Sequence, residues 1–273
     1  IYIYISMKKI FYFKKYIKNY FLETKFYSIF LLRPLNNRDW GRIAYTTSHY
    51  HKGEDYHKKF NDLPGRKIIW NLEKKIINRF LPKKIKLVHL DFASGSGRVS
   101  KFLERKVKKQ YLLDSSKKML EHAQKILNNS MIINRDFTKI KTIKKFDLVT
   151  AFRFFPNAEP DLRKKAIKFI FNSLKKDGIF IFNNHRNFWS LPYFLKRITF
   201  RSDGFGMTHS EVKKLIAPYK LKICEYRSIG LLTEKEKGYF ILWRIVESIE
   251  NFLFKLNSKH RLGYNIIYVL RKC

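Results

Sequence analysis

The stretch "VHLDFASGSGRVS", residues 88–100, joins a short apolar run to an aspartate and two glycines separated by one serine. An apolar run that ends in a glycine turn predicts a buried strand, a tight loop and the start of a helix. In an open α/β sheet, such a loop lies at the carboxyl end of a strand, where ligands bind. Gly95 and Gly97 would let the backbone bend and let a ligand approach without a Cβ in the way.

Strands and helices alternate on both sides of this loop. Apolar strands are predicted at 85–90, 110–114, 131–136, 146–152 and 178–184, and helices around 68–77, 99–103, 119–127 and 162–174. Strands that are apolar throughout, alternating with helices, predict a doubly wound parallel sheet. Two more strands at 221–226 and 264–272, a capping-box helix that begins at Thr208–Glu211 and an amphipathic helix at 240–256 extend the pattern.

An acidic residue is expected at the end of each of the first three strands. Asp91 precedes the glycines, Asp114 follows 23 residues later (114 − 91), and Asp136 is next to Phe137. A carboxylate at Asp91 repels a pyrophosphate but suits an ammonium group. Asp114 is placed to bind two ribose hydroxyls, and Asp136 with Phe137 suits the amine and the face of adenine. Together these groups describe S-adenosylmethionine.

Two other interpretations of the glycine loop stay open. A nicotinamide dinucleotide would favour G-x-G-x-x-G/A, whereas Ser100 occupies the third position here. Alternatively, the glycines form a structural turn without a ligand.

The ordered motifs resemble those of the class I S-adenosylmethionine-dependent methyltransferases, of the type 11/25 group. The resemblance covers about residues 85–185 and rests on "LDFASGSGR", "LLDSSKKML", "RDF" and the segment 146–185. It implies a Rossmann-like fold: a doubly wound, mostly parallel seven-stranded sheet with helices on both faces, an antiparallel last strand and an N-terminal helical arm or lid. Asp177-Gly178 replaces the family's Gly-Gly turn, and residues 154–156 are not the Asn/Asp-Pro-Pro-Tyr motif of amine-methylating nucleic-acid enzymes.

The resemblance also assigns cofactor-binding residues. The methionine part would lie against Asp91, Ala93, Ser94, Gly95, Ser96 and Gly97, the ribose against Asp114, Ser115 and Met119, the adenine against Asp136 and Phe137, and the sulfonium above Thr150, Ala151 and Phe152.

Methyl transfer is an in-line displacement that needs alignment more than a catalytic triad, and the sequence shows no triad. His185, after the fifth strand, is a candidate base or substrate anchor, or else a packing histidine. Arg153 would anchor an anionic group or lie at the surface. Tyr50, Tyr56 and Arg66 belong to the lid or to the core. His49, His51 and His57 lack a metal-ligand spacing, so no metal is expected.

Three regions are expected: a basic aromatic arm at 1–40, a helical lid at 41–84 and a methyltransferase domain at 85–273. Substrate-facing insertions are expected at about 186–207 and 228–262. Their aromatic residues would line an acceptor pocket or pack on the sheet.

Charge and composition leave the partner open. The formal net charge of +36 fits an anionic partner or an AT-rich genome, and two cysteines fit a reducing compartment. No apolar run approaches a membrane span. We expect a cytoplasmic protein whose arm contacts an anionic membrane or its own core. The expected acceptor is a small molecule, saccharide or lipid-like compound methylated at oxygen or nitrogen. An RNA methyltransferase and a non-catalytic basic scaffold are the alternatives.

Overall fold

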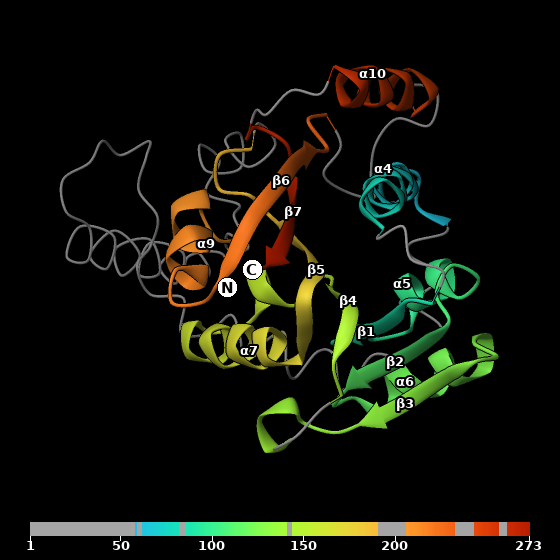
Figure 1. The fold of residues 1–273 in the computed structure, drawn as a ribbon. Coiled ribbons are helices and arrows are strands. Elements are labelled where there is room, and N and C mark those ends of the chain that lie inside the picture. Colours follow the sequence, from blue (N-terminus) through green and yellow to red (C-terminus); the bar gives the residue numbers. More distant parts are fainter. Residues whose placement is uncertain are drawn as a thin grey trace, which may run out of the picture.

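One seven-stranded sheet in the order β3-β2-β1-β4-β5-β7-β6 organises the protein (Figure 1). The computed structural model describes residues 58, 62–81, 86–140, 144–190, 206–232, 243–256 and 261–273. The strands are β1 (Val88–Phe92), β2 (Lys109–Asp114), β3 (Ser130–Asn134), β4 (Phe146–Ala151), β5 (Leu174–His185), β6 (Leu221–Ile229) and β7 (Asn265–Lys272). β1 to β5 run parallel, and β7 runs antiparallel to β5 and β6. The predicted fold class is confirmed.

Helices cover both faces of the sheet. They are α4 (Pro64–Phe80), α5 (Arg98–Leu103), α6 (Lys117–Ile126), α7 (Pro160–Ser173), α9 (His209–Ile216) and α10 (Trp243–Lys255), with short 3₁₀ turns η1 (Phe137–Lys139) and η2 (Phe155–Asn157). α7 and α9 pack on one face, and α4, α5, α6 and α10 lie on the other (Figure 1).

The alternation of side chains along each strand explains this two-sided burial. Leu148 and Val149 are adjacent in β4 and point to opposite apolar clusters, yet both are fully buried. Because helices cover both faces, neither position can be polar without losing packing. The continuous apolar strands of the sequence follow from this arrangement.

Some boundaries differ from the sequence prediction. The first strand begins at Val88 and reaches Phe92, and the third ends at Asn134. Asp136 therefore lies after β3, where its Oδ1 accepts hydrogen bonds from the backbone N–H (2.9 Å) and hydroxyl (2.8 Å) of Thr138. Such a local side-chain bond competes with continuation of the strand.

The helix N-termini agree with their sequence signals. α4 begins at Pro64, and its predicted apolar stripe, including Ile68 and Ile76, is buried. At α9 the predicted capping box is present: Thr208 Oγ1 accepts from the Glu211 N–H at 3.2 Å, and Glu211 Oε2 accepts from the Thr208 N–H at 2.6 Å.

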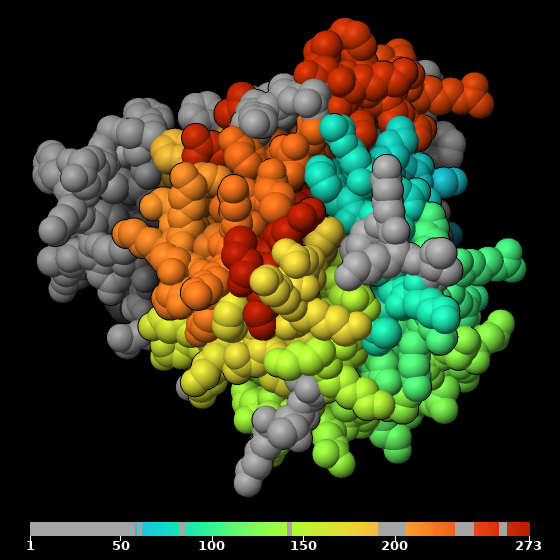
Figure 2. All heavy atoms as spheres, in the orientation of Figure 1, coloured from blue at the N-terminus to red at the C-terminus, as the bar shows by residue number. Residues whose placement is uncertain are grey.

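α10 lies at the surface beside α4 (Figures 1 and 2). Lys75 of α4 donates to Asn251 Oδ1 of α10 at 2.6 Å, and one side of α10 packs on the apolar cluster under α4. Its outer side leaves apolar residues exposed, among them Ile245 and Phe252. Among the helices within the described ranges, none has the length and apolar character needed to cross a bilayer. The predicted arm at 1–40 lies outside the described residues.

Candidate functional site

Asp91 is the last charged residue of β1 and is buried under the glycine loop. Its Oδ2 accepts hydrogen bonds from the Ser100 hydroxyl at 2.7 Å and from the Ser100 N–H at 3.2 Å. Its Oδ1 accepts from the Thr150 hydroxyl of β4 at 2.9 Å. The carboxylate thus joins the ends of two strands to the first turn of α5.

The Asp91 carboxylate lies at the N-terminus of α5, the position where a bound dinucleotide would have its phosphates. A pyrophosphate binds the backbone N–H groups at a helix N-terminus. In α5 the Ser100 N–H already donates to Asp91. A phosphate there would meet a carboxylate instead of a free donor, so the loop does not suit a dinucleotide.

A buried polar chain continues behind Asp91. His89 Nε2 lies 2.8 Å from Thr150 Oγ1, and burial lowers the pKa of His89 to about 3. Since the Thr150 hydroxyl donates to Asp91, a neutral His89 that donates from Nε2 completes the chain. Burial also raises the pKa of Asp91 to about 6, although its hydrogen bonds from Ser100 and Thr150 oppose that rise.

The two glycines are required by the backbone and by packing on α6. Gly95 and Gly97 have φ angles of 54° and 76°, in the left-handed region. A Cβ on Gly97 would lie 2.9 Å from the Cβ of Ala123, and one on Gly95 would lie 3.2 Å from Met119 Cε. Glycine at 95 and 97 is therefore needed for the backbone conformation and for packing, in addition to the role in ligand approach that the sequence predicts.

Asp114 at the end of β2 faces the same loop. Its Oδ2 accepts from the Gly95 N–H and its Oδ1 from the Ser116 N–H, both at 2.8 Å. These two backbone bonds hold the carboxylate against the glycine loop at the end of β2, where the sequence places the ribose. Ser115 beside it is exposed, and Met119 is buried against the loop.

Two serine hydroxyls of the loop suit a polar ligand. Ser94 Oγ and Ser96 Oγ are buried, and neither has a hydrogen-bond partner among the residues that the structure describes. Unsatisfied buried hydroxyls cost free energy and need an explanation. A hydroxyl rotates to donate, so these two groups fit the carboxylate of a bound methionine moiety.

The predicted adenine and floor residues lie along the neighbouring strand ends. Asp136 is partly buried, but the Phe137 ring packs edge-on against Phe92 (5.0 Å between centroids) and also contacts Phe154 and Phe169. The Phe137 ring is therefore packed largely against other aromatic residues of the apolar core. The floor residues Thr150, Ala151 and Phe152 are all buried at the end of β4.

The candidate acceptor residues lie two strands away from the glycine loop. β1 pairs with β4, and β4 with β5, so about 10 Å separates β1 from β5. Arg153 follows β4 and His185 ends β5. His185 is 3% exposed, and its pKa lies well below 6.5 because of burial and the charges of Arg153, Arg186 and Arg66. The imidazole is therefore neutral.

Sequence reasoning missed a buried ion pair beneath the site. Glu73 of α4 and Arg98 of α5 lie 2.9 Å apart, and both are buried. Glu73 Oε1 also accepts from Asn265 at 2.8 Å and Asn183 at 3.3 Å, while Arg98 stacks on Trp70 at 3.9 Å. The available signal was a glutamate inside the apolar stripe of 68–77, because buried acids are usually paired.

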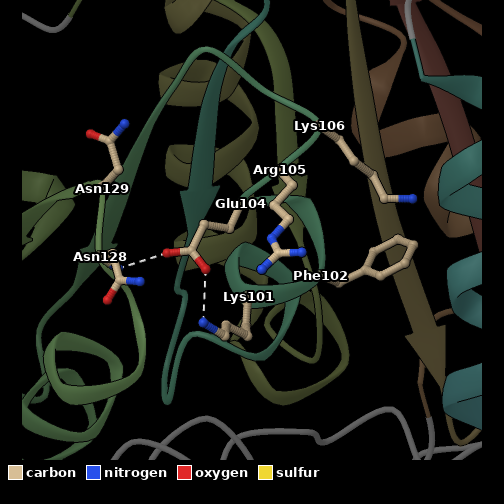
Figure 3. Close-up of a pocket in the computed structure, with 7 residues that line it drawn as sticks. All are labelled: Lys101, Phe102, Glu104, Arg105, Lys106, Asn128 and Asn129. Carbon is tan, nitrogen blue, oxygen red and sulfur yellow. Dashed lines mark hydrogen bonds and ion pairs between the residues drawn. The ribbon is translucent and has the colours of Figure 1, made fainter.

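A surface groove of about 430 Å³ lies at the amino ends of the strands, opposite the ends that carry the glycine loop (Figure 3). It is lined by Lys101, Phe102, Glu104, Arg105, Lys106, Asn128 and Asn129, near the amino ends of β2 and β3. Figure 3 shows Glu104 pointing toward Lys101 and Asn128, which it binds at 2.8 and 2.7 Å. The groove is thus remote from the glycine loop.

Several candidates lie outside the described residues: Tyr50, Tyr56 and the histidines of 49–57. In the described ranges, no three His, Cys, Asp or Glu side chains converge as they would around a metal ion.

Comparison with known proteins places this geometry in a wider group. Residues 90–178, about one third of the chain, match the family model described as "Methyltransferase domain". No curated protein matches the chain in sequence.

Solved structures share the fold at low sequence identity. A chain from the Haloferax volcanii complex between the Trm112 methyltransferase activator and a methyltransferase has a TM-score of 0.55 and 14% identity, covering 85% of this chain and 96% of that one. An S-adenosylmethionine-dependent methyltransferase from Thermotoga maritima gives 0.54 and 14%, with 81% and 95% covered. The N-methyltransferase NodS of Bradyrhizobium japonicum, in complex with S-adenosyl-L-homocysteine, gives 0.52 and 12%, with 78% and 90% covered. These likenesses concern the fold alone.

Proposed function

The chain belongs to the class I S-adenosylmethionine-dependent methyltransferases, and we propose that it methylates an oxygen or nitrogen of a small-molecule, saccharide or lipid-like acceptor. The observation that carries this proposal is the position of neutral, buried His185 about 10 Å along the sheet edge from the glycine loop. A donor at the loop and an acceptor at His185 would then face each other.

The residues of the donor half would hold the cofactor in order along the edge. Ser94 and Ser96 supply hydroxyl donors for the methionine carboxylate, and Asp114 supplies acceptors for the ribose hydroxyls. Asp91 acts mainly through the loop: it fixes Ser100 and Thr150 and keeps phosphate from the start of α5. Asp136 and Phe137 complete the adenine end.

S-adenosylmethionine supplies an activated methyl group on a sulfonium. The work of the chain is alignment and exclusion of water, and alignment of this kind contributes about 7–11 kcal/mol in favourable cases. Buried Thr150, Ala151 and Phe152 form a dry floor at the end of β4.

On the acceptor side, His185 is well suited to orient the nucleophile. A neutral imidazole accepts a hydrogen bond from an O–H or N–H group. With its pKa well below 6.5, it is a weak base. Arg153 would bind a negatively charged part of the acceptor, and Tyr56 would approach from the lid segment.

We extend the proposal to the division of the chain. The arm at 1–40 would contact an anionic membrane, the lid at 41–84 would cover the donor, and the insertions at about 186–207 and 228–262 would border the acceptor. Cys224 and Cys273 are exposed free thiols, which fits a cytoplasmic enzyme.

Transfer of a labelled methyl group tests the acceptor class. The protein is incubated with [methyl-¹⁴C]S-adenosylmethionine and separate metabolite, glycolipid and RNA fractions. We expect label in the first or second fraction, and loss of that label with Asp114→Asn. Label in the RNA fraction alone would replace this proposal with the RNA methyltransferase. Absence of label from all three fractions would contradict the proposed acceptor.

A further inference from the structure

Large apolar side chains are exposed along one side of α10. Ile245, Ile249 and Phe252 follow one another at intervals of four and three residues. Leu256 comes directly after the helix, and its N–H still donates to the Phe252 carbonyl at 3.1 Å. The four side chains are between 39% and 60% exposed. Because residues at this spacing share one face of a helix, they form a single apolar row, which we call the α10 stripe.

α10 is fixed at the carboxyl edge of the sheet, the edge that carries the candidate site. Buried Glu250 accepts hydrogen bonds from the Gly230 N–H at 3.1 Å and the Leu232 N–H at 2.7 Å, just after β6 ends. β5 and β6 both pair antiparallel with β7, so they run in the same direction and end at the same edge. Figure 1 shows β6 running toward α10. The α10 stripe therefore belongs to the side of the molecule where the acceptor is expected.

Other exposed apolar side chains gather at this edge. Trp189 follows β5, Leu232 follows β6 and Leu262 precedes β7, and all three are exposed. Among the described residues, the remaining exposed large apolar side chain is Met131 of β3, at the opposite side of the sheet. Single exposed apolar residues are ordinary, whereas a group on one side of a molecule marks an interaction surface.

Basic residues border the α10 stripe on the side of α4. Lys75 of α4 donates to Asn251 of α10 at 2.6 Å, and Arg244 and Lys255 share the Asn251 side of the helix. The exposed basic residues of the two helices are Lys67, Lys75, Arg79, Arg244 and Lys255. In α4 and α10, which the structure describes throughout, the acids Glu73 and Glu250 are buried and Glu247 is half-buried. The exposed charges beside the stripe are thus positive.

We propose that the α10 stripe and its basic border dock the protein on the surface of an anionic lipid bilayer. A helix with an apolar face and flanking cations lies in the plane of a membrane interface, where anionic lipids attract the cations. A second copy of the chain is a poorer occupant, because two chains of formal net charge +36 repel each other. In Figure 2, α10 projects from the molecule beside α4, which leaves the stripe accessible to a flat surface.

Docking through α10 would bring the edge that carries the candidate site to the membrane. The docking surface does not depend on the proposed function, but this consequence rests on it: among the proposed acceptors, a lipid-like compound would be favoured over a soluble metabolite. Trp189 would then lie near the interface, where tryptophan is commonly found in membrane proteins.

Sedimentation of the full-length protein with vesicles tests the docking surface. We expect binding to vesicles of phosphatidylcholine with phosphatidylglycerol, and binding weaker by about tenfold or more to phosphatidylcholine alone, since each cation near an anionic surface contributes about fivefold. The double variant Ile249→Gln/Phe252→Gln should weaken binding by about tenfold or more, because two apolar side chains no longer enter the interface. Met131→Gln, the matched exposed residue of β3, should bind as the wild type does.

A fluorescent label separates docking through α10 from binding through any other basic segment. Cys224 and Cys273 are exposed and are replaced by serine, and an environment-sensitive dye is attached to Ile249→Cys or, as the control, to Met131→Cys. Anionic vesicles that contain a spin-labelled lipid should quench the dye at 249 and leave the dye at 131 unchanged.

Three outcomes would overturn the inference. They are the absence of vesicle binding, vesicle binding without quenching at 249, and burial of the dye at 249 in a dimer without lipid. Calorimetry with S-adenosyl-L-homocysteine in the absence of vesicles tests the proposed function separately, because donor binding does not require the α10 stripe.

Discussion

Ser100 donates both its hydroxyl, at 2.7 Å, and its backbone N–H, at 3.2 Å, to Oδ2 of Asp91. Ser100 stands where a dinucleotide-binding motif would have its third glycine or an alanine. The same residue binds the carboxylate of Asp91 beside the glycine loop. Its two bonds place a carboxylate at the start of α5, where negative charge is electrostatically favourable.

Ser100→Ala should weaken the fold at neutral pH. The variant keeps the N–H donor but loses the hydroxyl bond to a buried carboxylate, worth about 1.5–3 kcal/mol for a charged group. The pKa of Asp91 should rise further, because that hydroxyl bond lowers it. Urea denaturation at pH 7.5 measures the loss of unfolding free energy. Ser210→Ala, at an exposed serine of α9, is the control and should change little.

The raised pKa of Asp91 gives a pH dependence of defined sign. Its pKa is about 6 in the folded state against an ordinary 3.8, so the folded protein binds more protons between these values. Its contribution to stability is present below pH 3.8 and is lost as the pH rises through 6, amounting to about 3 kcal/mol. Denaturation of wild type and Asp91→Asn from pH 4 to 7.5 measures it. The free energy of unfolding of the wild type should fall relative to that of Asp91→Asn as the pH rises across this range. A difference that stays constant would contradict a raised pKa at Asp91.

Gly97→Ala should destabilise the loop by about 2 kcal/mol or more. The φ of 76° costs an L-residue about 1–2 kcal/mol, and the new methyl would lie 2.9 Å from the Ala123 Cβ. Thermal denaturation measures the loss. Adding Ala123→Gly removes the shortest contact, but the contact with Leu127 Cδ1 at 3.2 Å and the backbone cost remain. The double variant should therefore recover part of the effect once the cost of glycine in α6, measured in Ala123→Gly alone, is subtracted.

Replacing only one partner of the buried Glu73–Arg98 ion pair should strongly lower the free energy of unfolding. Glu73→Leu leaves a buried guanidinium without its carboxylate, which typically costs about 3–5 kcal/mol. The double variant Glu73→Leu/Arg98→Met replaces both charges with apolar groups and should recover at least half of that loss. Chemical denaturation measures the free energy of unfolding of both variants. A double variant as unstable as the single one would mean that packing or the lost bonds from Asn183 and Asn265 to Glu73, rather than the unpaired charge, account for the loss.

The sequence predicted the fold well because the signals were local and periodic. Strands such as 146–152 are apolar on both faces, and this pattern alone requires helices on both sides of a parallel sheet. Thr208 and Glu211 likewise marked the start of α9 by capping chemistry. The end of β3 was missed because the side-chain bond of Asp136 to Thr138 depends on a local turn.

The site was predicted less completely, because its side-chain contacts join segments that are far apart in the sequence. Asp91 was expected to face an ammonium group, but its bonds to Ser100 and Thr150 depend on how β1, β4 and α5 meet. Arg186 gave no periodic or motif signal, and its proximity to Arg153 results from the pairing of β4 with β5. The cofactor residues and His185 stay predictions that the geometry makes chemically reasonable.

Calorimetric titration of S-adenosylmethionine and, separately, NADH into wild type and Asp114→Asn tests the central claim most directly. Asp114 joins the glycine loop to the end of β2 and is the residue expected to hold the ribose. Loss of a charged acceptor costs about 1.5–3 kcal/mol, or roughly 10- to 100-fold in affinity. We predict micromolar binding of S-adenosylmethionine, weakened to this extent in Asp114→Asn, unaffected in the exposed control Asp161→Asn, and no binding of NADH. Binding of NADH without S-adenosylmethionine would contradict the account.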